Sequence, residues 1–351
     1  MITRRQLLST LATASATLAV AWKSSPALAA NTDWQAVKDE TFAFIKKCLR
    51  PDGSYAPSPD AAYAGNSDTG LSDLAAVTYA AVLAKTVGWE LPEAKKSAEF
   101  IHKHQQPDGR FINLGGAMKA TEDLAILYNT TQGVVSLRAL GQKPQIDPSP
   151  IMKRFFEPGA IEKLPWYTTS FFPLFYAALE KPFPPEYQKA LSDYMKKNQT
   201  EDGYLQDHIA ATYHAAHFYR LVGEETPRGQ AMLRRALKDQ KADGGWNIRE
   251  PDWDVHACFD AVFVLRHLGG DSAECRAAIA KAAEWVMTCR NPDGGFAHYP
   301  KEHSDMDAVY FQFGTLIQAQ LIPGTRFDLP DAHTLSWGHA MVPGKKYSIG
   351  R

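Results

Sequence analysis

One short turn sequence recurs along this chain, and its repetition constrains the fold more than any other feature. In most copies a Gln or Asn lies a few residues before an Asp-Gly pair, and in all of them an aromatic side chain follows within two residues. The copies are Pro51-Asp52-Gly53, Pro107-Asp108-Gly109, Glu201-Asp202-Gly203, Ala242-Asp243-Gly244 and Pro292-Asp293-Gly294. A degenerate turn, Glu157-Pro158-Gly159, lies in the middle of the one double interval. The chain therefore contains six units of roughly 40–55 residues, a period typical of repeat architectures.

Each unit predicts two helices of different character. The first mixes Lys, Glu and Ala at helical spacing and has one solvated face, whereas the second is nearly apolar all round and should be buried. We expect the first helices at 34–50, 92–106, 150–157, 185–198, 227–240 and 271–290. We expect the second helices at 73–87, 126–140, 166–179, 208–222, 254–268 and 307–321. The pattern predicts an all-α fold, an (α/α)6 toroid or barrel of six helical hairpin repeats, with the apolar helices inside.

The Asp-Gly turns themselves are interpreted as scaffold. Asp accepts hydrogen bonds from nearby backbone N–H groups, and Gly supplies a positive φ. The four cysteines show no paired spacing and lie on predicted helices, so we expect buried thiols rather than disulfides. The net charge is −1 with no basic stripe, which argues against a nucleic-acid partner.

The first 30 residues are predicted to be a signal peptide that is removed from the fold. Arg4-Arg5 precedes a weakly apolar stretch, and Ala27-Leu28-Ala29 places small residues where a signal peptidase cleaves. The arginine pair indicates the twin-arginine export machinery as a partner and a periplasmic or secreted location. The toroid should then span residues 31–328, and residues 329–351 should form a C-terminal tail.

The repeated Gln-x-x-Asp-Gly-Gly-Trp/Phe pattern resembles the repeats of the terpenoid cyclase and protein prenyltransferase superfamily. The resemblance covers almost all of the mature chain. It implies the toroid fold and, less directly, an isoprenoid cyclase or transferase activity, because a fold does not fix a function.

A local match within this resemblance is Pro251-Asp252-Trp253-Asp254-Val255-His256. Class II triterpene cyclases carry an Asp-x-Asp-Asp-Thr-Ala motif after a Pro, and its central Asp protonates an alkene or epoxide. The resemblance implies that Asp254 is the acid, Asp252 its partner carboxylate and His256 an orienting group, although Val255 replaces the final Asp. The residues themselves leave two interpretations open. Two close carboxylates raise one pKa, or Asp254 simply caps its helix, as Asp73 and Asp307 would cap theirs.

We expect no metal ion and no cofactor. The prenyltransferase branch binds zinc through an Asp and a Cys two residues apart and a distant His. The place of that His is taken here by Ala308 or Val309, so this zinc site is not expected. A different metal site, built from Asp254, His256 and the cluster around His303, is the alternative. There is no Gly-rich phosphate loop.

Candidate substrate contacts lie on the second helices. His208 begins the fourth of these helices and should border the same mouth as Asp254. Aromatic side chains should line the interior, where ordinary core packing is the alternative to carbocation stabilisation. The aromatic candidates are Trp166, Tyr167, Tyr213, Phe259 and Tyr310.

Three functions remain open from the sequence. The first is an isoprenoid cyclase or transferase that uses acid catalysis at Asp254. The second is a periplasmic polysaccharide lyase or glycoside hydrolase on an α/α toroid, for which Arg249, Asp252 and Asp254 are the nearest candidate set. The third is a non-catalytic binding scaffold. The ligand is accordingly an apolar isoprenoid or a glycan.

Overall fold

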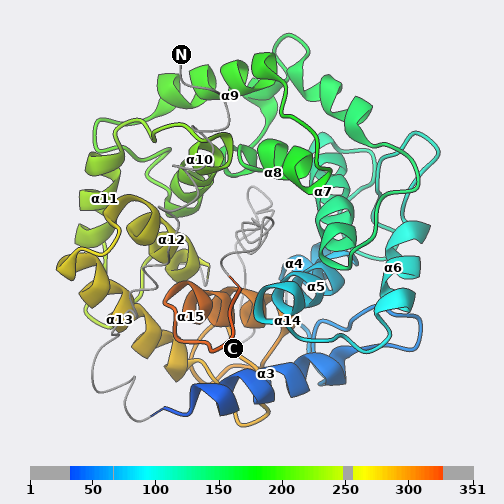
Figure 1. Ribbon diagram of the computed structural model, residues 1–351, viewed down its shortest axis with the longest axis vertical. Helices are drawn as coiled ribbons and strands as arrows, with labels where there is room; N and C mark the ends of the chain where they lie inside the picture. Colours follow the sequence, from blue (N-terminus) through cyan, green and yellow to red (C-terminus); the bar gives the residue numbers. More distant parts are fainter. Residues whose placement is uncertain (1–31, 66, 248–255, 327–351) are drawn as a thin grey trace, which may run out of the picture.

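The computed structural model describes residues 32–65, 67–247 and 256–326, and these residues form a closed ring of helices. Figure 1 shows α5, α7, α8, α10, α12 and α15 around the inside and α3, α6, α9, α11 and α13 around the outside. No β-strand occurs among these residues, which contain only isolated bridges. The predicted (α/α)6 toroid is therefore confirmed.

The helices follow the predicted order. The outer elements are α3 (Trp34–Cys48), α6 (Ala94–Lys103), η1 (Ser149–Phe156), α9 (Pro185–Asn198), α11 (Gly229–Lys238) and α13 (Ala273–Thr288). The inner elements are α5 (Ala75–Val87), α7 (Asp123–Ala139), α8 (Phe171–Ala178), α10 (Ile209–Val222) and α12 (Ala257–Gly269), followed by α14 (Met306–Ala308), η4 (Val309–Phe313) and α15 (Gly314–Gln318) in the last repeat. Three short elements precede inner helices: α4 (Asp68–Leu71), η2 (Ile161–Lys163) and η3 (Trp166–Thr168).

The inner helices are buried on nearly every side. All residues of α5 except Lys85 are buried, whereas α6 buries only Ser97, Ala98 and Ile101. This difference agrees with the apolar composition of the inner helices and the mixed composition of the outer ones. The four cysteines are free and buried, as predicted.

The third repeat departs most from the others. Its outer element η1 is a 3₁₀ helix, and its inner element is split between η3 and α8. Pro173 explains the split, because proline has no backbone N–H to donate within a helix and is tolerated only in the first turn. A helix that began earlier would place Pro173 in its interior. The last inner helix also departs from a regular α-helix, since η4 is a π-helix between α14 and α15.

The Asp-Gly turns act as scaffold, as predicted. In each of the five, the Asp side chain accepts from the backbone N–H two residues later, as Asp243 does from Gly245 at 3.0 Å. Gly244 has a φ of +98°, and a Cβ there would lie 2.3 Å from the carbonyl oxygen of Lys281 in the next outer helix. Both the backbone conformation and the close contact require glycine.

The glutamine before a turn ties that turn to the following repeat. Gln240 Nε2 donates to the carbonyl oxygens of Gly244 at 3.0 Å and Ala278 at 2.7 Å. Gln105 and Gln199 make equivalent pairs of hydrogen bonds in their own repeats. The Gln of the repeat pattern therefore joins consecutive units.

The first and last repeats close the ring. A Cβ at Gly294 would lie 2.4 Å from the carbonyl oxygen of Glu40 in α3. The backbone N–H of Met306 donates to the carbonyl of Pro57 at 2.7 Å. These contacts exclude an open superhelix for the described residues.

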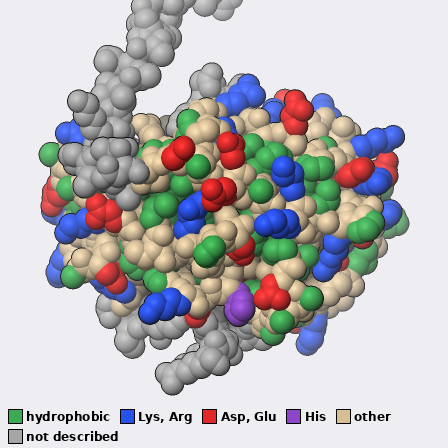
Figure 2. All heavy atoms as spheres, turned by 90° about the horizontal axis from the view of Figure 1, so that it is seen from below, with side chains coloured by type: hydrophobic (Ala, Val, Ile, Leu, Met, Phe, Trp, Pro, Cys, Tyr) green, Lys and Arg blue, Asp and Glu red, His purple; other side chains and the backbone are tan. Residues whose placement is uncertain are grey.

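Charges of both signs are interspersed over the face that Figure 2 shows, without a large region of one sign. This distribution agrees with the small net charge of −1. None of the described helices combines the length and the hydropathy that crossing a membrane requires.

Candidate active site

A cluster of buried acids, histidines and tyrosines lies where the fifth, sixth and first repeats meet. Asp305 and Asp307 flank the start of α14, and His298 lies in the loop before it. His256 precedes the first residue of α12. Tyr79 comes from α5, in the first repeat. The closure of the ring therefore assembles this cluster from segments that are far apart in the sequence.

Asp307 is the centre of the cluster. Its Oδ2 atom lies 2.9 Å from His256 Nε2 and 3.6 Å from His298 Nε2, and its Oδ1 atom accepts from the hydroxyl of Tyr79 at 3.0 Å. The side chain of Asp307 is 0% exposed. A carboxyl group that is removed from water in this way depends on these neighbours for its charge and its proton.

Asp305 forms the second half of the cluster. Its Oδ2 atom lies 2.9 Å from His298 Nε2 and accepts from the hydroxyl of Tyr63 at 2.9 Å. Its Oδ1 atom caps α14 by accepting from the backbone N–H of Ala308. Burial alone would lower the pKa of His298, but Asp305, followed by Asp307, outweighs it and raises that pKa to about 9. His298 is therefore a cation at neutral pH.

The same atoms have the chemistry of metal ligands. One ligand atom each of His256, His298 and Asp307 lie within 4.8 Å of one another. Tetrahedral zinc, with bonds near 2.0–2.2 Å, needs ligand atoms about 3.4 Å apart. The 2.9 Å contact between His256 and Asp307 is shorter than that and is a hydrogen bond, so a metal ion would have to replace a proton. The arrangement as it stands is an acid–base cluster.

Aromatic rings form a closed belt through the inner helices. Successive ring centroids lie 4.5–6.1 Å apart, and the side chains are 0% exposed. In order, the belt runs through Tyr79 (α5), Tyr310 (η4), Phe259 (α12), Tyr213 and His214 (α10), Phe171 (α8) and Tyr128 (α7). The hydroxyls of Tyr128 and Tyr79 both reach Asp68 Oδ2, which completes the circuit. The belt begins at Tyr79, whose hydroxyl donates to Asp307.

The predicted polar site residues differ in where they lie relative to the acid cluster. Asp252 and Asp254 lie outside the described residues, so their roles stay predictions. His256 lies in the cluster, but its described carboxylate partner is Asp307. His208 caps α10, its Nδ1 atom accepting from the backbone N–H of Ala211.

Only some of the predicted aromatic substrate contacts belong to the aromatic belt. Tyr213, Phe259 and Tyr310 belong to the belt. Trp166 instead stacks on Tyr194 of the outer helix α9, with ring centroids 4.6 Å apart. Tyr167 is buried, and its hydroxyl has no hydrogen-bond partner among the described residues. Whether these residues contact a ligand stays a prediction.

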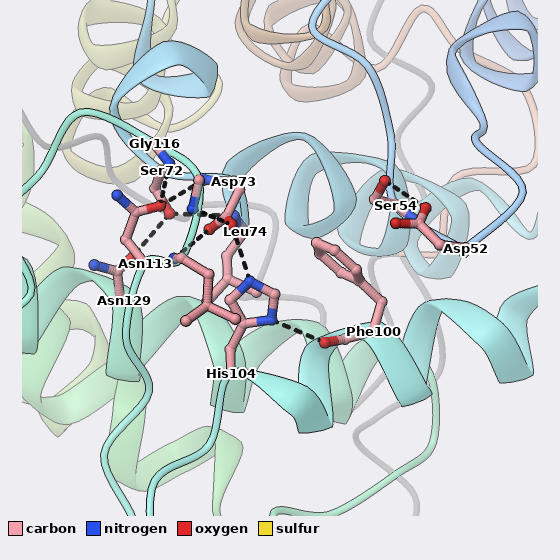
Figure 3. A network of polar contacts seen from close by, with 12 residues as sticks. Asp52, Ser54, Ser72, Asp73, Leu74, Phe100, His104, Asn113, Gly116 and Asn129 are labelled. Atoms are coloured by element: carbon pink, nitrogen blue, oxygen red, sulfur yellow. Dashed lines mark hydrogen bonds and ion pairs between the residues drawn. The ribbon is translucent and has the colours of Figure 1, made fainter.

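The capping alternative is wrong for Asp73 and Asp307. Neither is an N-cap, because the caps are Leu74 for α5 and Asp305 for α14. Figure 3 shows Asp73 joined instead to His104, whose Nε2 atom lies 3.1 Å away. Asp73 also accepts from the backbone N–H of Gly115 at 2.8 Å. Asp73 thus fastens the loop after the second turn, while Asp307 belongs to the acid cluster.

Sequence reasoning missed the importance of Asp305, Asp307, His298 and Tyr79. One signal was available. Asp305-Met306-Asp307-Ala308 repeats, in the next unit, the Asp-x-Asp spacing of Asp252-Trp253-Asp254. The tyrosine carries no such signal, because nothing in a local pattern brings α5 against α14.

A closed ring of helical hairpins, with an aromatic interior and buried acids at the start of its inner helices, defines an α/α toroid. The family model for the prenyltransferase alpha-alpha toroid domain matches residues 5–149 and 166–338, and the chain belongs to this family. Curated proteins give no match.

Solved structures agree on the fold. Protein geranylgeranyltransferase-I of Candida albicans, complexed with GGPP, is similar with a TM-score of 0.60 and 13% identity over 75% of this chain and 89% of that one. A type II terpene cyclase from Scytonema, in complex with geranylgeranyl dihydroxybenzoate, is similar with a TM-score of 0.55 and 15% identity over 86% of this chain and 98% of that one. At these identities the likeness shows the fold alone. The comparisons give no support to a polysaccharide lyase, a glycoside hydrolase or a silent scaffold.

Proposed function

We propose that this protein is an isoprenoid-handling enzyme that protonates a neutral polyene, with Asp307 and its histidines as the acid centre. The observation that carries the proposal is the contact set of Asp307, in which a fully buried carboxyl group meets His256, His298 and Tyr79. Protonation of a carbon–carbon double bond needs a strong acid in a site without water. His298 Nε2 lies 3.6 Å from the same Asp307 oxygen as His256, so both histidines would face the carboxylate left after proton transfer.

The aromatic belt supplies the second half of the chemistry. Proton transfer from Asp307 to an alkene carbon leaves a carbocation, and the faces of aromatic rings attract cations. The belt starts at Tyr79, which touches Asp307, and continues directly to Tyr310. A polyene held along these rings would keep each cation next to an aromatic face until a final deprotonation.

The acids favour a neutral substrate over a diphosphate. Among the described residues, no lysine or arginine forms a hydrogen bond or an ion pair with Asp305 or Asp307. Diphosphate oxygens are usually held by such cations or by metal ions. The similar type II terpene cyclase, which carries a geranylgeranyl dihydroxybenzoate, agrees with a neutral prenyl chain as the reacting part. That cyclase is matched over 98% of its length, so a single toroid is sufficient for cyclase chemistry.

Metal-assisted prenyl transfer is the second candidate, because one ligand atom each of His256, His298 and Asp307 lie within 4.8 Å of one another. These residues would hold the ion, which would activate a nucleophile for attack on a prenyl diphosphate. Removing the metal would then abolish activity, whereas proton-initiated chemistry needs none.

The test is a substrate panel incubated in D₂O, with products followed by mass spectrometry. The panel contains squalene and geranylgeranyl dihydroxybenzoate as polyenes without a diphosphate and geranylgeranyl diphosphate as the polyene with one. We expect a polyene without a diphosphate to give a cyclic isomer that carries one deuterium, with and without EDTA. Asp73→Asn is the matched control, because Asp73 also pairs with a histidine but lies outside the cluster. Turnover of the diphosphate alone, lost with EDTA and restored by zinc, would replace this proposal by the second candidate.

A further inference from the structure

Basic residues gather at the end of the barrel that lies opposite the acid cluster. An outer helix returns the chain between successive inner helices, so the inner helices all begin at one end and finish at the other. The acid cluster lies where they begin. Lys85, Arg138, Arg220 and Arg266 occupy the last turns of α5, α7, α10 and α12. The helix dipole favours a cation near a helix C-terminus, which explains why basic residues recur there.

The Arg220 guanidinium differs from a cation that only answers a helix dipole. Its Cζ atom lies 5.5 Å from the centroid of the Phe263 ring in the neighbouring inner helix α12, within cation–π distance (Figure 1 shows α10 beside α12). Arg220 is exposed, yet burial is the main cause that lowers its pKa, while Tyr213 of the aromatic belt acts in the opposite sense. The guanidinium therefore lies close to the protein interior and can still be reached from solvent.

Two other arginines show how a guanidinium is usually matched in this protein. Arg235 forms ion pairs with three aspartates. Arg266 donates from Nη1 to the carbonyl oxygen of Gln318, at the end of α15, at 2.5 Å. The side chain of Arg220 makes no hydrogen bond or ion pair with any described residue, and the ring of Phe263 is its contact. Its planar fork of N–H donors is thus left for an oxyanion, whose oxygen atoms match that fork.

The last turn of α12 adds to the positive potential around Arg220. Burial, followed by Arg220, lowers the pKa of Arg266 to about 10, while Asp271 acts in the opposite sense. Burial, followed by Arg220, also lowers the pKa of His267 to about 4, so this imidazole is neutral at pH 7 and has one N–H to donate. The rings of His267 and Phe263 have centroids 5.8 Å apart. Arg220 and His267 thus pack on the same aromatic ring, with the charge of Arg266 close to them.

We propose that Arg220 and His267, supported by the positive charge of Arg266, bind a phosphate group at the basic end of the barrel. The Arg220 guanidinium would hold two phosphate oxygens through parallel N–H donors, and His267 would donate to the phosphate as well. The bound anion would also offset the repulsion between Arg220 and Arg266. This site does not depend on the acid chemistry proposed for Asp307.

Two sources carry this chemistry, a free phosphate ion and the headgroup of a prenyl phosphate. The second source rests on the isoprenoid ligand proposed above. It would place the headgroup at Arg220 and the start of the prenyl chain toward Tyr213, the belt residue that acts on Arg220. The uncharged end of such a chain would then be free to extend along the belt.

Calorimetric titration of the folded protein with inorganic phosphate and with geranylgeranyl phosphate, at constant ionic strength, tests the site without any turnover. We expect binding to weaken by about tenfold or more in Arg220→Gln. Arg220→Lys should weaken it less, because it keeps the charge and loses the planar fork. Arg234→Gln is the matched control, since Arg234 is exposed on the outer helix α11 and its loss removes the same charge. Circular dichroism confirms that each variant is folded.

The two probes distinguish the two sources. Similar affinities for inorganic phosphate and geranylgeranyl phosphate, both lost in Arg220→Gln, would identify a site for a free ion. Much tighter binding of geranylgeranyl phosphate than of either inorganic phosphate or geranylgeraniol, again lost in Arg220→Gln, would identify a headgroup site. The proposal is overturned if neither phosphate binds, if Arg220→Gln binds both as the wild type does, or if Arg234→Gln weakens binding equally. None of these outcomes depends on whether Asp307 protonates a polyene.

Discussion

His256 Nε2 lies 2.9 Å from Asp307 Oδ2, although 51 residues separate the two positions in the sequence. The ring geometry brings together the starts of the fifth and sixth inner helices, and this contact is the result. His256 also lies against the ring of Phe311, with centroids 3.9 Å apart. One face of the imidazole therefore meets the apolar interior while its edge meets the acid.

This contact predicts the effect of changing His256. His256→Ala should lower turnover by about 10²–10⁴-fold, the usual contribution of a positioned acid–base group. His256→Gln should recover part of that loss, because its side-chain N–H can reach the same carboxyl oxygen. The measurement is kcat for both variants on one substrate. Equal activity of His256→Ala and the wild type would show that the imidazole has only a packing role.

The second prediction concerns stability and pH. His298 has a pKa of about 9 in the folded protein, above the ordinary histidine value of 6.5. Because the folded pKa is raised, the stabilisation is fully present below pH 6.5 and is lost as the pH rises to about 9. The difference corresponds to roughly 3 kcal/mol at most. Urea unfolding between pH 6 and pH 10 should show this decline in the wild type, and a much smaller one in His298→Gln. An identical decline in both proteins would assign the pH dependence to other groups.

The third prediction tests ring closure. Gly294→Ala should destabilise the fold for two reasons, a φ of +89° and a Cβ 2.4 Å from the Glu40 carbonyl. Gly223→Ala is the matched control, because its φ is +73° and a Cβ there meets nothing within 4 Å. The control should lose about 1–2 kcal/mol from backbone strain alone, and Gly294→Ala should lose clearly more. If denaturant unfolding gave similar losses of stability in both variants, the contact between the first and last repeats would adjust to the added Cβ at little cost.

Export stays a prediction, since residues 1–31 lie outside the described part of the chain. Arg4-Arg5 and Ala27-Leu28-Ala29 predict a mature N-terminus near Ala30 or Asn31. Arg4→Lys together with Arg5→Lys should keep the protein in the cytoplasm with Met1 retained. N-terminal sequencing of fractionated cells measures this, and wild-type periplasmic protein that begins at Met1 would contradict it.

The sequence predicts the scaffold well because each repeat carries its own local determinants. Gln240, Asp243 and Gly244 specify one turn and its contact to the next helix, and similar residues return in other repeats. The site depends instead on which repeats meet. Asp307 occupies a position typical of a helix cap, yet its partners come from α5 and α12, and only ring closure supplies them. Local patterns also could not place the cap two residues earlier, at Asp305, or predict the π-helix that follows.

The central claim is that Asp307 delivers the proton. The most direct measurement is deuterium incorporation from D₂O into the product of a neutral polyene, compared between wild type, Asp307→Asn and Asp254→Asn. We predict one deuterium per product molecule in the wild type and a loss of at least about 10³-fold in turnover for Asp307→Asn, with its thermal unfolding still cooperative. A product without deuterium, or a folded Asp307→Asn variant that turns over at the wild-type rate while Asp254→Asn is inactive, would contradict the account and place the acid at Asp254.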